Sequence, residues 1–110
     1  MSKRNTQLLV EDILESCHKI MEYTNGISFK EFVADSKTID AVVRNFEIIG
    51  EAANRLPEEF KDLHQDIDWF RIRGFRNRIV HDDFGIDYSI VWQVKETYLP
   101  QLIINLEKIT

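Results

Sequence analysis

Apolar residues recur at helical spacing along almost the whole chain, and this periodicity limits what the chain can fold into more than any other feature. No stretch alternates strictly between apolar and polar residues, as a half-buried strand would. Glycine and proline, which interrupt helices, account for only 4 and 2 of the 110 residues. The sequence therefore predicts an all-α fold, an up-and-down bundle of four main helices with one or two short extra helices, in a single domain over residues 1–110.

Capping residues, glycines and prolines mark where the expected helices begin and end. Asn, Ser and Asp side chains can accept hydrogen bonds from the first turn of a helix, and a proline ends or restarts one. From these signals we expect a first helix from Asn5 or Thr6 to Asn25-Gly26, a short one from Ser28, with its capping-box partner Glu31, to about Ala34, and a long one from Asp35 or Ser36 to Pro57. A brief helix should follow Pro57, and another should run from Asp66 or Asp68 to about Asp82. The last begins at Asp87 and enters a segment that Pro100 kinks or restarts.

The chain is acidic overall but basic in one place. Its net charge of −5 argues against the broad basic surface that non-specific nucleic-acid binders use. An enzyme that cleaves RNA needs only a local basic patch, and an acidic remainder would limit indiscriminate binding. Such a patch is present within eight residues: Arg71, Arg73, Arg76 and Arg78.

The expected location is the cytoplasm. No run of about 18 apolar residues is present, and the N-terminal segment lacks the apolar core of a signal peptide, so we expect no membrane association. A single cysteine, Cys17, excludes an intrachain disulfide and fits a reducing compartment. Because Cys17 lies among Leu14, Ile20 and Met21, it is expected in the core.

Three polar side chains with complementary chemistry lie close together in the sequence: Arg76, Asn77 and His81. On one continuous helix Asn77 and His81 would share a face, and Arg76 and His81 would lie about 140° apart. A histidine titrates near neutral pH and can serve as a general acid or base, and an arginine carries a permanent planar charge that suits phosphate oxygens. The three could therefore bind a phosphate and move a proton without a metal.

Cleavage of RNA needs just these functions, because the 2′-hydroxyl supplies an internal nucleophile. We assign His81 as the general acid/base, Arg76 as the transition-state stabiliser, and Asn77 as the residue that orients the histidine or the phosphate. Arg73 and Arg78 are candidate contacts to the substrate backbone. One helix alone makes an open site, so we expect a homodimer in which two such helices face each other. An Arg-x4-His spacing by itself also arises by chance in many helices, where the histidine only faces the helix C-terminus.

The segment Gly-Phe-Arg-Asn-Arg-Ile-Val-His-Asp-Asp-Phe-Gly at residues 74–85, followed by Asp87, Val91 and Trp92, resembles the signature of the HepT-like toxins of the HEPN superfamily. The segment that starts at Ala41 and the tail Tyr98-Leu-Pro-Gln-Leu resemble further blocks of that family, so the resemblance covers most of residues 36–103. It implies a HEPN-type bundle, a homodimer, and a metal-independent endoribonuclease without cofactors. It also implies a toxin whose partner is a cognate nucleotidyltransferase antitoxin of the minimal type.

The resemblance departs at one position. In HepT-like toxins a tyrosine two residues after the histidine is the side chain that the partner modifies with AMP. Here that position is Asp83, which has no hydroxyl to accept the group. Tyr88 is a weak substitute, and inhibition by direct binding or by modification elsewhere are alternatives. Asp82 and Asp83 could instead orient His81 or Arg76.

Two other functions compete with the nuclease. The same fold could be a non-catalytic subunit of a nucleotidyltransferase complex, in which Arg76 and His81 grip a nucleotide or a partner. It could also be a degenerate interaction domain that only dimerises.

The remaining polar and aromatic candidates favour structural roles. Glu47 and Glu51 alternate with Arg44 and Arg55, which predicts a surface ion-pair row; the alternative is that Arg44 or Glu51 lines the cleft. His18 and His64 lack companions at metal-ligand spacing, so no metal site is expected. Trp69 and Trp92 are expected to anchor the core or a dimer interface rather than to stack on bases.

Gly74 is unusual for the interior of a helix, where glycine costs about 1 kcal/mol relative to alanine. It is either a tolerated local weakness or a point where a second backbone approaches closely, such as that of a partner subunit.

Overall fold

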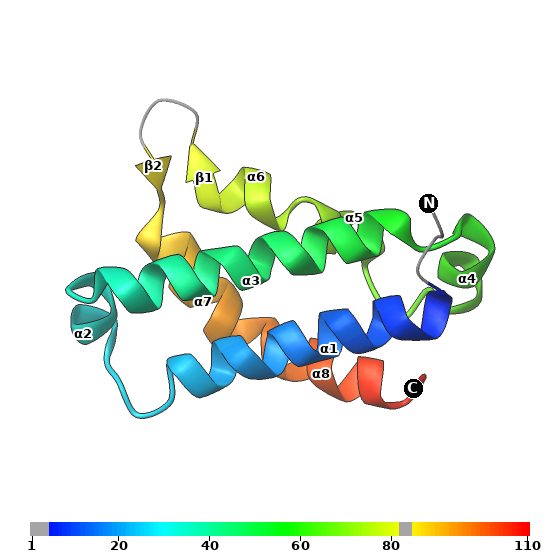
Figure 1. Ribbon diagram of the computed structural model, residues 1–110, viewed down its shortest axis with the longest axis horizontal. Coiled ribbons are helices and arrows are strands. Elements are labelled where there is room, and N and C mark those ends of the chain that lie inside the picture. The colour runs from blue at the N-terminus through cyan, green and yellow to red at the C-terminus, as the bar shows by residue number, and fades with distance from the viewer. Residues whose placement is uncertain (1–4, 82–84) are drawn as a thin grey trace.

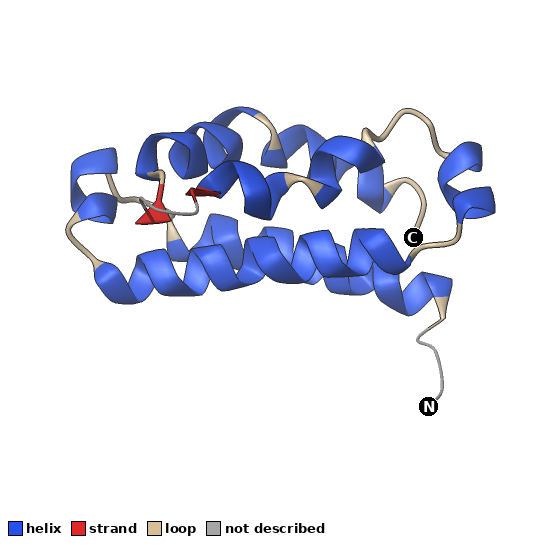
Figure 2. Cartoon of the chain, turned by 90° about the horizontal axis from the view of Figure 1, so that it is seen from above, coloured by secondary structure: helices blue, strands red, loops and turns tan. Residues whose placement is uncertain are grey.

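The computed structural model describes residues 5–81 and 85–110 of the chain. In this part of the chain nearly all regular structure is helical, and Figure 2 shows two very short strands beside the helices. Four helical segments run along the length of the molecule (Figure 1): α1 (Thr6–Tyr23), α3 (Ser36–Arg55), the pair α5 (Trp69–Arg73) and α6 (Phe75–Ile79), and the pair α7 (Tyr88–Thr97) and α8 (Leu99–Glu107). The segment α3 packs against both α1 and α5–α6, while α8 packs against α1 and α7 packs against α6. The expected all-α bundle is therefore confirmed, with α2 and α4 as the short extra helices.

The caps at the start of the chain form as expected. Helix α1 spans Thr6–Tyr23, and the side chain of Asn5 accepts a hydrogen bond of 2.9 Å from the backbone N–H of Leu8. Helix α2 spans Phe29–Val33 and begins with a capping box, because the Ser28 hydroxyl accepts from the N–H of Glu31 and the Glu31 carboxylate accepts from the N–H of Ser28. Each cap satisfies backbone groups that the first turn of a helix leaves without partners.

Helix α3 is the central helix of the bundle and spans Ser36–Arg55. Asp35 caps it by accepting from the N–H of Thr38, and Leu56 follows it in an extended conformation before Pro57. Its buried stripe faces the neighbouring helices, since its apolar residues recur every three or four positions. The buried residues of α3 are Ile39, Val42, Val43, Asn45, Phe46, Ile49, Gly50, Ala52 and Ala53.

Prolines shape two further helices as the sequence predicts. Helix α4, Glu58–Leu63, begins directly after Pro57, with two glutamates in its first turn. Helix α7 spans Tyr88–Thr97 and is capped by the Asp87 carboxylate, which accepts from the N–H of Ile90. Pro100 lies in the first turn of α8, Leu99–Glu107, so it restarts the helix after a break at Tyr98. No helix in the described part of the chain is long and apolar enough to cross a membrane.

Aromatic side chains join the helices at two places in the core. Phe75 of α6 meets the ring of Phe46 edge-on at 5.5 Å and that of Tyr98 at 5.4 Å. Trp92 packs against Phe29 and Phe32 of α2. Cys17 is fully buried, and burial raises its pKa to about 12, so its placement in the core is confirmed.

One expected helix is wrong. The helix predicted from Asp66 or Asp68 to about Asp82 is instead two five-residue helices, α5 at Trp69–Arg73 and α6 at Phe75–Ile79, separated at Gly74. Val80 is extended, with φ −108° and ψ 117°, and begins a strand. The helical hydrogen bonds are replaced there by pairing between two short strands, which the sequence analysis did not foresee.

Candidate active site

The first part of the candidate site is α5, which a capping residue and two inward side chains hold in place. The Asp68 carboxylate accepts a hydrogen bond of 3.0 Å from the N–H of Arg71, which caps the helix. Trp69 and Ile72 are buried, and the Trp69 indole donates to the carbonyl oxygen of His64 at 3.0 Å. The remaining side chains of α5 face outward.

Glycines allow α5 to lie close to the central helix and then break. A Cβ atom on Gly50 of α3 would lie 3.4 Å from the carbonyl oxygen of Arg73, so a larger side chain at this position would push α5 away. A close approach of two backbones, one of the two alternatives considered for Gly74, is thus found within the chain at Gly50. Gly74 ends α5 and precedes α6, and its N–H donates to the carbonyl oxygens of both Phe70 and Arg71.

The second part is α6, which presents three polar side chains to solvent. Its apolar residues Phe75 and Ile79 are buried and fix its orientation. The side chains between them are exposed: Arg76, Asn77 and Arg78. The predicted candidates on this helix are thus accessible to a ligand, and nothing in the core competes for them.

The third part is the strand that carries His81. Strand β1, Val80–His81, pairs antiparallel with β2, Gly85–Ile86, so that Val80 lies opposite Ile86 and His81 lies opposite Gly85. The N–H of Asp87 donates to the carbonyl oxygen of Ile79 at 2.7 Å, next to the paired strands. Gly85 has φ +76°, a conformation that glycine adopts without strain.

This hairpin corrects the expected geometry of the site. The sequence analysis placed Arg76, Asn77 and His81 on one helix, with Asn77 and His81 on a shared face. Arg76 and Asn77 do lie on α6, but the helix ends at Ile79 and the His81 backbone belongs to β1. The 140° relation between Arg76 and His81 therefore does not apply. The two residues are related instead through the turn of the chain from α6 into the hairpin (Figure 1).

The basic patch lies on the outer side of α5 and α6. Residues 69–80 contain four of the chain's 14 basic residues and none of its 19 acidic ones. The Arg71 guanidinium lies 4.5 Å from the centre of the Tyr98 ring, and that of Arg73 lies 5.8 Å from the ring of Phe70. Burial raises the pKa of Tyr98; Asp68 adds to this rise and Arg71 opposes it. The Tyr98 phenol therefore keeps its proton to higher pH than an exposed tyrosine would.

The remaining candidates in the sequence include two aspartates, a tyrosine and the expected ion-pair row. Asp82 and Asp83, including the position of the missing tyrosine, lie outside the described residues, and Tyr88 is a partly exposed residue at the start of α7. The ion-pair row on α3 is confirmed for three of its four predicted members, since Arg44 lies 3.6 Å from Glu47 and 4.0 Å from Glu51.

Both tryptophans are packing residues, as expected. Trp69 is 7% exposed, and Trp92 packs under the Lys95 ammonium at 4.1 Å. Among the described residues no three His, Cys, Asp or Glu side chains gather as a metal-binding group.

One residue of the patch was missed by sequence reasoning. Phe70 is 80% exposed, although it is flanked by the buried Trp69 and lies one residue before Arg71. The signal was available in the spacing, because the inward residues of this segment recur every three or four positions and Phe70 lies off that stripe. The inward residues are Trp69, Ile72, Phe75 and Ile79.

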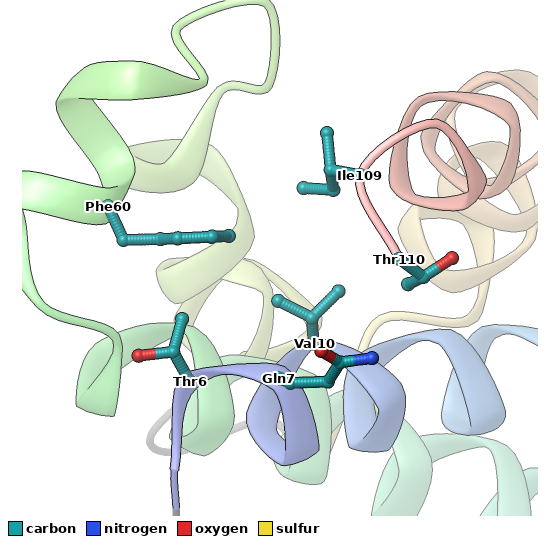
Figure 3. A pocket seen from close by; sticks show the side chains of 6 residues that line it. All are labelled: Thr6, Gln7, Val10, Phe60, Ile109 and Thr110. Carbon is teal, nitrogen blue, oxygen red and sulfur yellow. The ribbon is translucent and has the colours of Figure 1, made fainter.

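A cavity of about 210 Å³, shown in Figure 3, lies beside α4 and the start of α1, at the end of the bundle opposite β1 and β2 (Figure 1). It is bounded by the first turns of α1, by Phe60 of α4 and by the C-terminal residues Ile109 and Thr110. None of the side chains lining it is charged, so it lacks the groups that recognise a phosphate. It is not part of the candidate site.

Comparisons with known proteins agree along nearly the whole chain. A family profile described as ribonuclease HepT-like matches residues 13–109. The "Probable ribonuclease HepT" of Thermococcus cleftensis is 38% identical over 107 residues, which cover 97% of each chain. The "Putative RNase TTE0752" of Caldanaerobacter subterraneus subsp. tengcongensis is 41% identical over 93 residues, 84% of this chain and 83% of the relative.

A third relative, the "Putative RNase MJ0127" of Methanocaldococcus jannaschii, is 37% identical over 109 residues, 99% of this chain and 90% of the relative. No solved structure matches the chain. The family profile and these relatives span the bundle and the Arg-Asn-x3-His segment alike, and the chain belongs to the ribonuclease HepT-like family.

Proposed function

We propose that this chain is a metal-independent endoribonuclease whose active site consists of Arg76, Asn77 and His81. Membership of its family makes it a ribonuclease, and the proposal concerns how and where it cuts. The observation that carries it is the exposure of Arg76 and Asn77 on α6, directly before the strand that holds the His81 backbone.

The proposed reaction uses the RNA's own 2′-hydroxyl as the nucleophile. A base takes the 2′-hydroxyl proton as the 2′-oxygen bonds to phosphorus, and the bond from phosphorus to the 5′-oxygen breaks as that oxygen gains a proton. The products are a 2′,3′-cyclic phosphate and a 5′-hydroxyl. His81 is the general acid/base in this scheme, because an imidazole exchanges protons near neutral pH.

Arg76 and Asn77 act on the phosphate. The phosphorane carries more negative charge on its oxygens than the diester does, so a fixed guanidinium stabilises the transition state more than the ground state. Asn77, one residue further on α6, orients the phosphate or the histidine through its amide. Arg73 and Arg78, which precede and follow these two residues in the sequence, are exposed and bind neighbouring phosphates of the RNA.

A homodimer would complete this site. In one copy Arg76, Asn77 and Arg78 are exposed on an outer surface, which leaves a bound phosphate open to water. Two copies related by a two-fold axis next to α6 would enclose the phosphate between two Arg-His sets. A low-dielectric cleft of this kind strengthens the interaction between guanidinium and phosphorane.

We further propose that the enzyme is the cytoplasmic toxin of a toxin–antitoxin pair whose antitoxin is a minimal nucleotidyltransferase. Asp83 stands at the position where such toxins carry the modified tyrosine, so restraint of this toxin would depend on direct binding or on another hydroxyl. Tyr88 offers one, since it is partly exposed at the start of α7.

The test is cleavage of a defined RNA by the purified protein in EDTA. Wild type should cut the RNA, and Arg76→Ala and His81→Ala should each slow cleavage by roughly 10²- to 10⁴-fold. His18→Ala is the matched control, because His18 is an exposed histidine on α1 that lies 3.9 Å from Glu107 and should not affect cleavage.

Two results would contradict the proposal. Full activity in folded His81→Ala protein would remove the histidine from the chemistry. No cleavage by folded wild type, together with binding to a nucleotidyltransferase, would favour the non-catalytic subunit. Growth arrest on expression of wild type but not of His81→Ala would support the toxin role.

A further inference from the structure

Phe70 is an exposed aromatic side chain on α5 that does not belong to the buried core. Its side chain is 80% accessible, whereas its neighbour Trp69 is buried and hydrogen-bonded. The large apolar residues of α5 and α6 otherwise face inward, so Phe70 is the exception in a segment with clear amphipathic spacing. Leaving a phenyl ring in water contributes nothing to the stability of the fold.

The surroundings of Phe70 favour an anionic partner. The Arg73 guanidinium lies 5.8 Å from the centre of its ring, and no acidic residue occurs between Trp69 and Val80. An exposed ring beside a guanidinium matches the two components of single-stranded nucleic acid, because a base has an apolar face and each phosphate carries a negative charge.

The position of Phe70 relative to the catalytic residues fits the same ligand. Phe70, Arg73 and Asn77 follow one another at intervals of three and four residues, and all three are exposed. Phe70 and Arg73 lie on α5, and Asn77 follows on α6 directly after the break at Gly74. Asp66 and Asp68 lie on the other side of Phe70 and would repel a phosphate there. A strand bound at Phe70 would therefore run from α5 toward α6.

We infer that Phe70 is a stacking platform for an unpaired base of the RNA substrate, and that Arg73 holds the phosphate next to that base. This inference rests on the proposed function, since it assigns a substrate class to the same site. It makes single-stranded RNA the preferred substrate, because a base within a duplex cannot expose its face to a side chain.

The test measures binding separately from cleavage. A short 2′-O-methyl RNA has no free 2′-hydroxyl and cannot be cut by the proposed route, so wild-type protein can be used. The strand carries a fluorescent dye for anisotropy and 2-aminopurine, whose emission falls when it stacks on an aromatic ring. The same strand annealed to its complement is the double-stranded probe.

Wild type should bind the single strand more tightly than the duplex and quench the 2-aminopurine. Phe70→Ala should weaken single-strand binding by about 5- to 150-fold and abolish the quenching, while Phe70→Tyr should retain both. The salt dependence of binding should not change in Phe70→Ala, because the phosphate contacts remain. In Arg73→Ala the slope of log K against log salt should fall by about 1.

Ile104→Ala is the control for loss of an exposed apolar side chain. Ile104 is 48% exposed on α8 and does not belong to the basic patch, so its loss should leave RNA binding unchanged. The molecular mass of each variant is measured by sedimentation at the concentrations used for binding.

The outcomes separate this inference from the nuclease itself. Unchanged single-strand binding and quenching in Phe70→Ala would overturn the stacking role. So would loss of a dimer in that variant with intact RNA binding, which would assign Phe70 to a contact between copies. Wild type that binds as described but never cleaves RNA would retain the platform and remove the nuclease. Cleavage that depends on His81 but not on Phe70 would retain the nuclease and remove the platform.

Discussion

The pair α1–α3 and the segment from α5 to β2 are built in opposite ways. Helices α1 and α3 have 18 and 20 residues, are capped at their N-termini by Asn5 and Asp35, and bury continuous apolar stripes. Helices α5 and α6 have five residues each, and the segment then turns into two-residue strands. The first region supplies the longest buried stripes of the core, and the second presents four arginines and Phe70 on its outer side.

The difference shows how a small bundle can separate stability from function. The inward residues of α5 and α6 hold the segment against α3, so its outward residues are free to serve a ligand. Changes in the first region should therefore affect unfolding more than RNA binding, and changes on the outer side of the second should do the opposite. The predictions below test this separation.

The largest expected effect is loss of a core ring. Phe46 is fully buried on α3 and packs edge-on against Phe75. Phe46→Ala should lower the free energy of unfolding by about 3–5 kcal/mol, because it removes buried area and leaves a cavity. Urea unfolding followed by circular dichroism measures this. Phe70→Ala, which removes the same side chain from the surface, should change it by less than about 0.5 kcal/mol. Equal losses in the two variants would show that the buried and the exposed ring contribute alike to stability.

The second effect is a loss of stability at alkaline pH that depends on Cys17 of α1. Burial raises the pKa of this thiol from 9.0 to about 12, so the folded state holds the proton more tightly than the unfolded state. The resulting stability is fully present below pH 9 and is lost as the pH rises toward 12. Urea unfolding at a series of pH values should show this decline, and Cys17→Ala should flatten it. The raised pKa of Tyr98 should leave part of the slope in that variant.

Gly50 should connect the two regions, because the α5 backbone rests against it. Gly50→Leu forces side-chain atoms toward the carbonyl oxygens of Ile72 and Arg73, and should cost about 1–3 kcal/mol while also lowering RNA cleavage. Gly50→Ala is the matched variant, since its Cβ would lie 3.4 Å from the nearest atom and can be accommodated. Normal cleavage by a destabilised Gly50→Leu protein would show that α5 does not need its close position.

A smaller effect is expected at the cap of α5. Asp68→Ala removes the acceptor for the N–H of Arg71 and should cost about 1 kcal/mol of stability. Asp68→Asn keeps an acceptor oxygen and should recover most of this loss. Amide hydrogen exchange should show the effect in α5 and not in α1. A uniform change across both helices would argue that the segment does not open independently.

The smallest effect on stability is expected for two exposed arginines, which should differ instead in their effect on RNA binding. Arg44 belongs to the ion-pair row on α3, and Arg78 is exposed on α6. Arg44→Ala and Arg78→Ala should each change stability by no more than about 1 kcal/mol. Only Arg78→Ala should weaken RNA binding and its salt dependence. Equal RNA binding by both variants would remove Arg78 from the substrate contacts.

The fold was predictable where one physical signal dominates. The caps at Asn5, Ser28 and Asp87 and the helix restart at Pro100 each follow from local hydrogen-bonding capacity or from the missing N–H of proline. The bundle itself follows from the spacing of apolar residues, since a long amphipathic helix has few other ways to bury its stripe.

The helical part of the candidate site was predictable, but its geometry was not, and the roles of its residues stay predictions. Arg76 and Asn77 were placed correctly on a helix, but the helix was extended through His81. The pairing of Val80 with Ile86 depends on contacts between separate segments, which helical spacing does not report. The β-branched Ile79-Val80 before the turn and Gly85 after it were the available signs of a hairpin. The exposure of Phe70 follows only from the phase of the helix, which turns the neighbouring Trp69 inward.

The two tryptophans give the molecule two optical reporters with separate locations. Trp69 lies next to Phe60 of α4, whereas Trp92 lies against Phe29 and Phe32 of α2, and Figure 1 shows α2 and α4 at opposite ends of the bundle. The indole emission of single-tryptophan variants would therefore report the two ends independently. Because Trp69 directly precedes Phe70, its fluorescence would also register what occupies the outer side of α5.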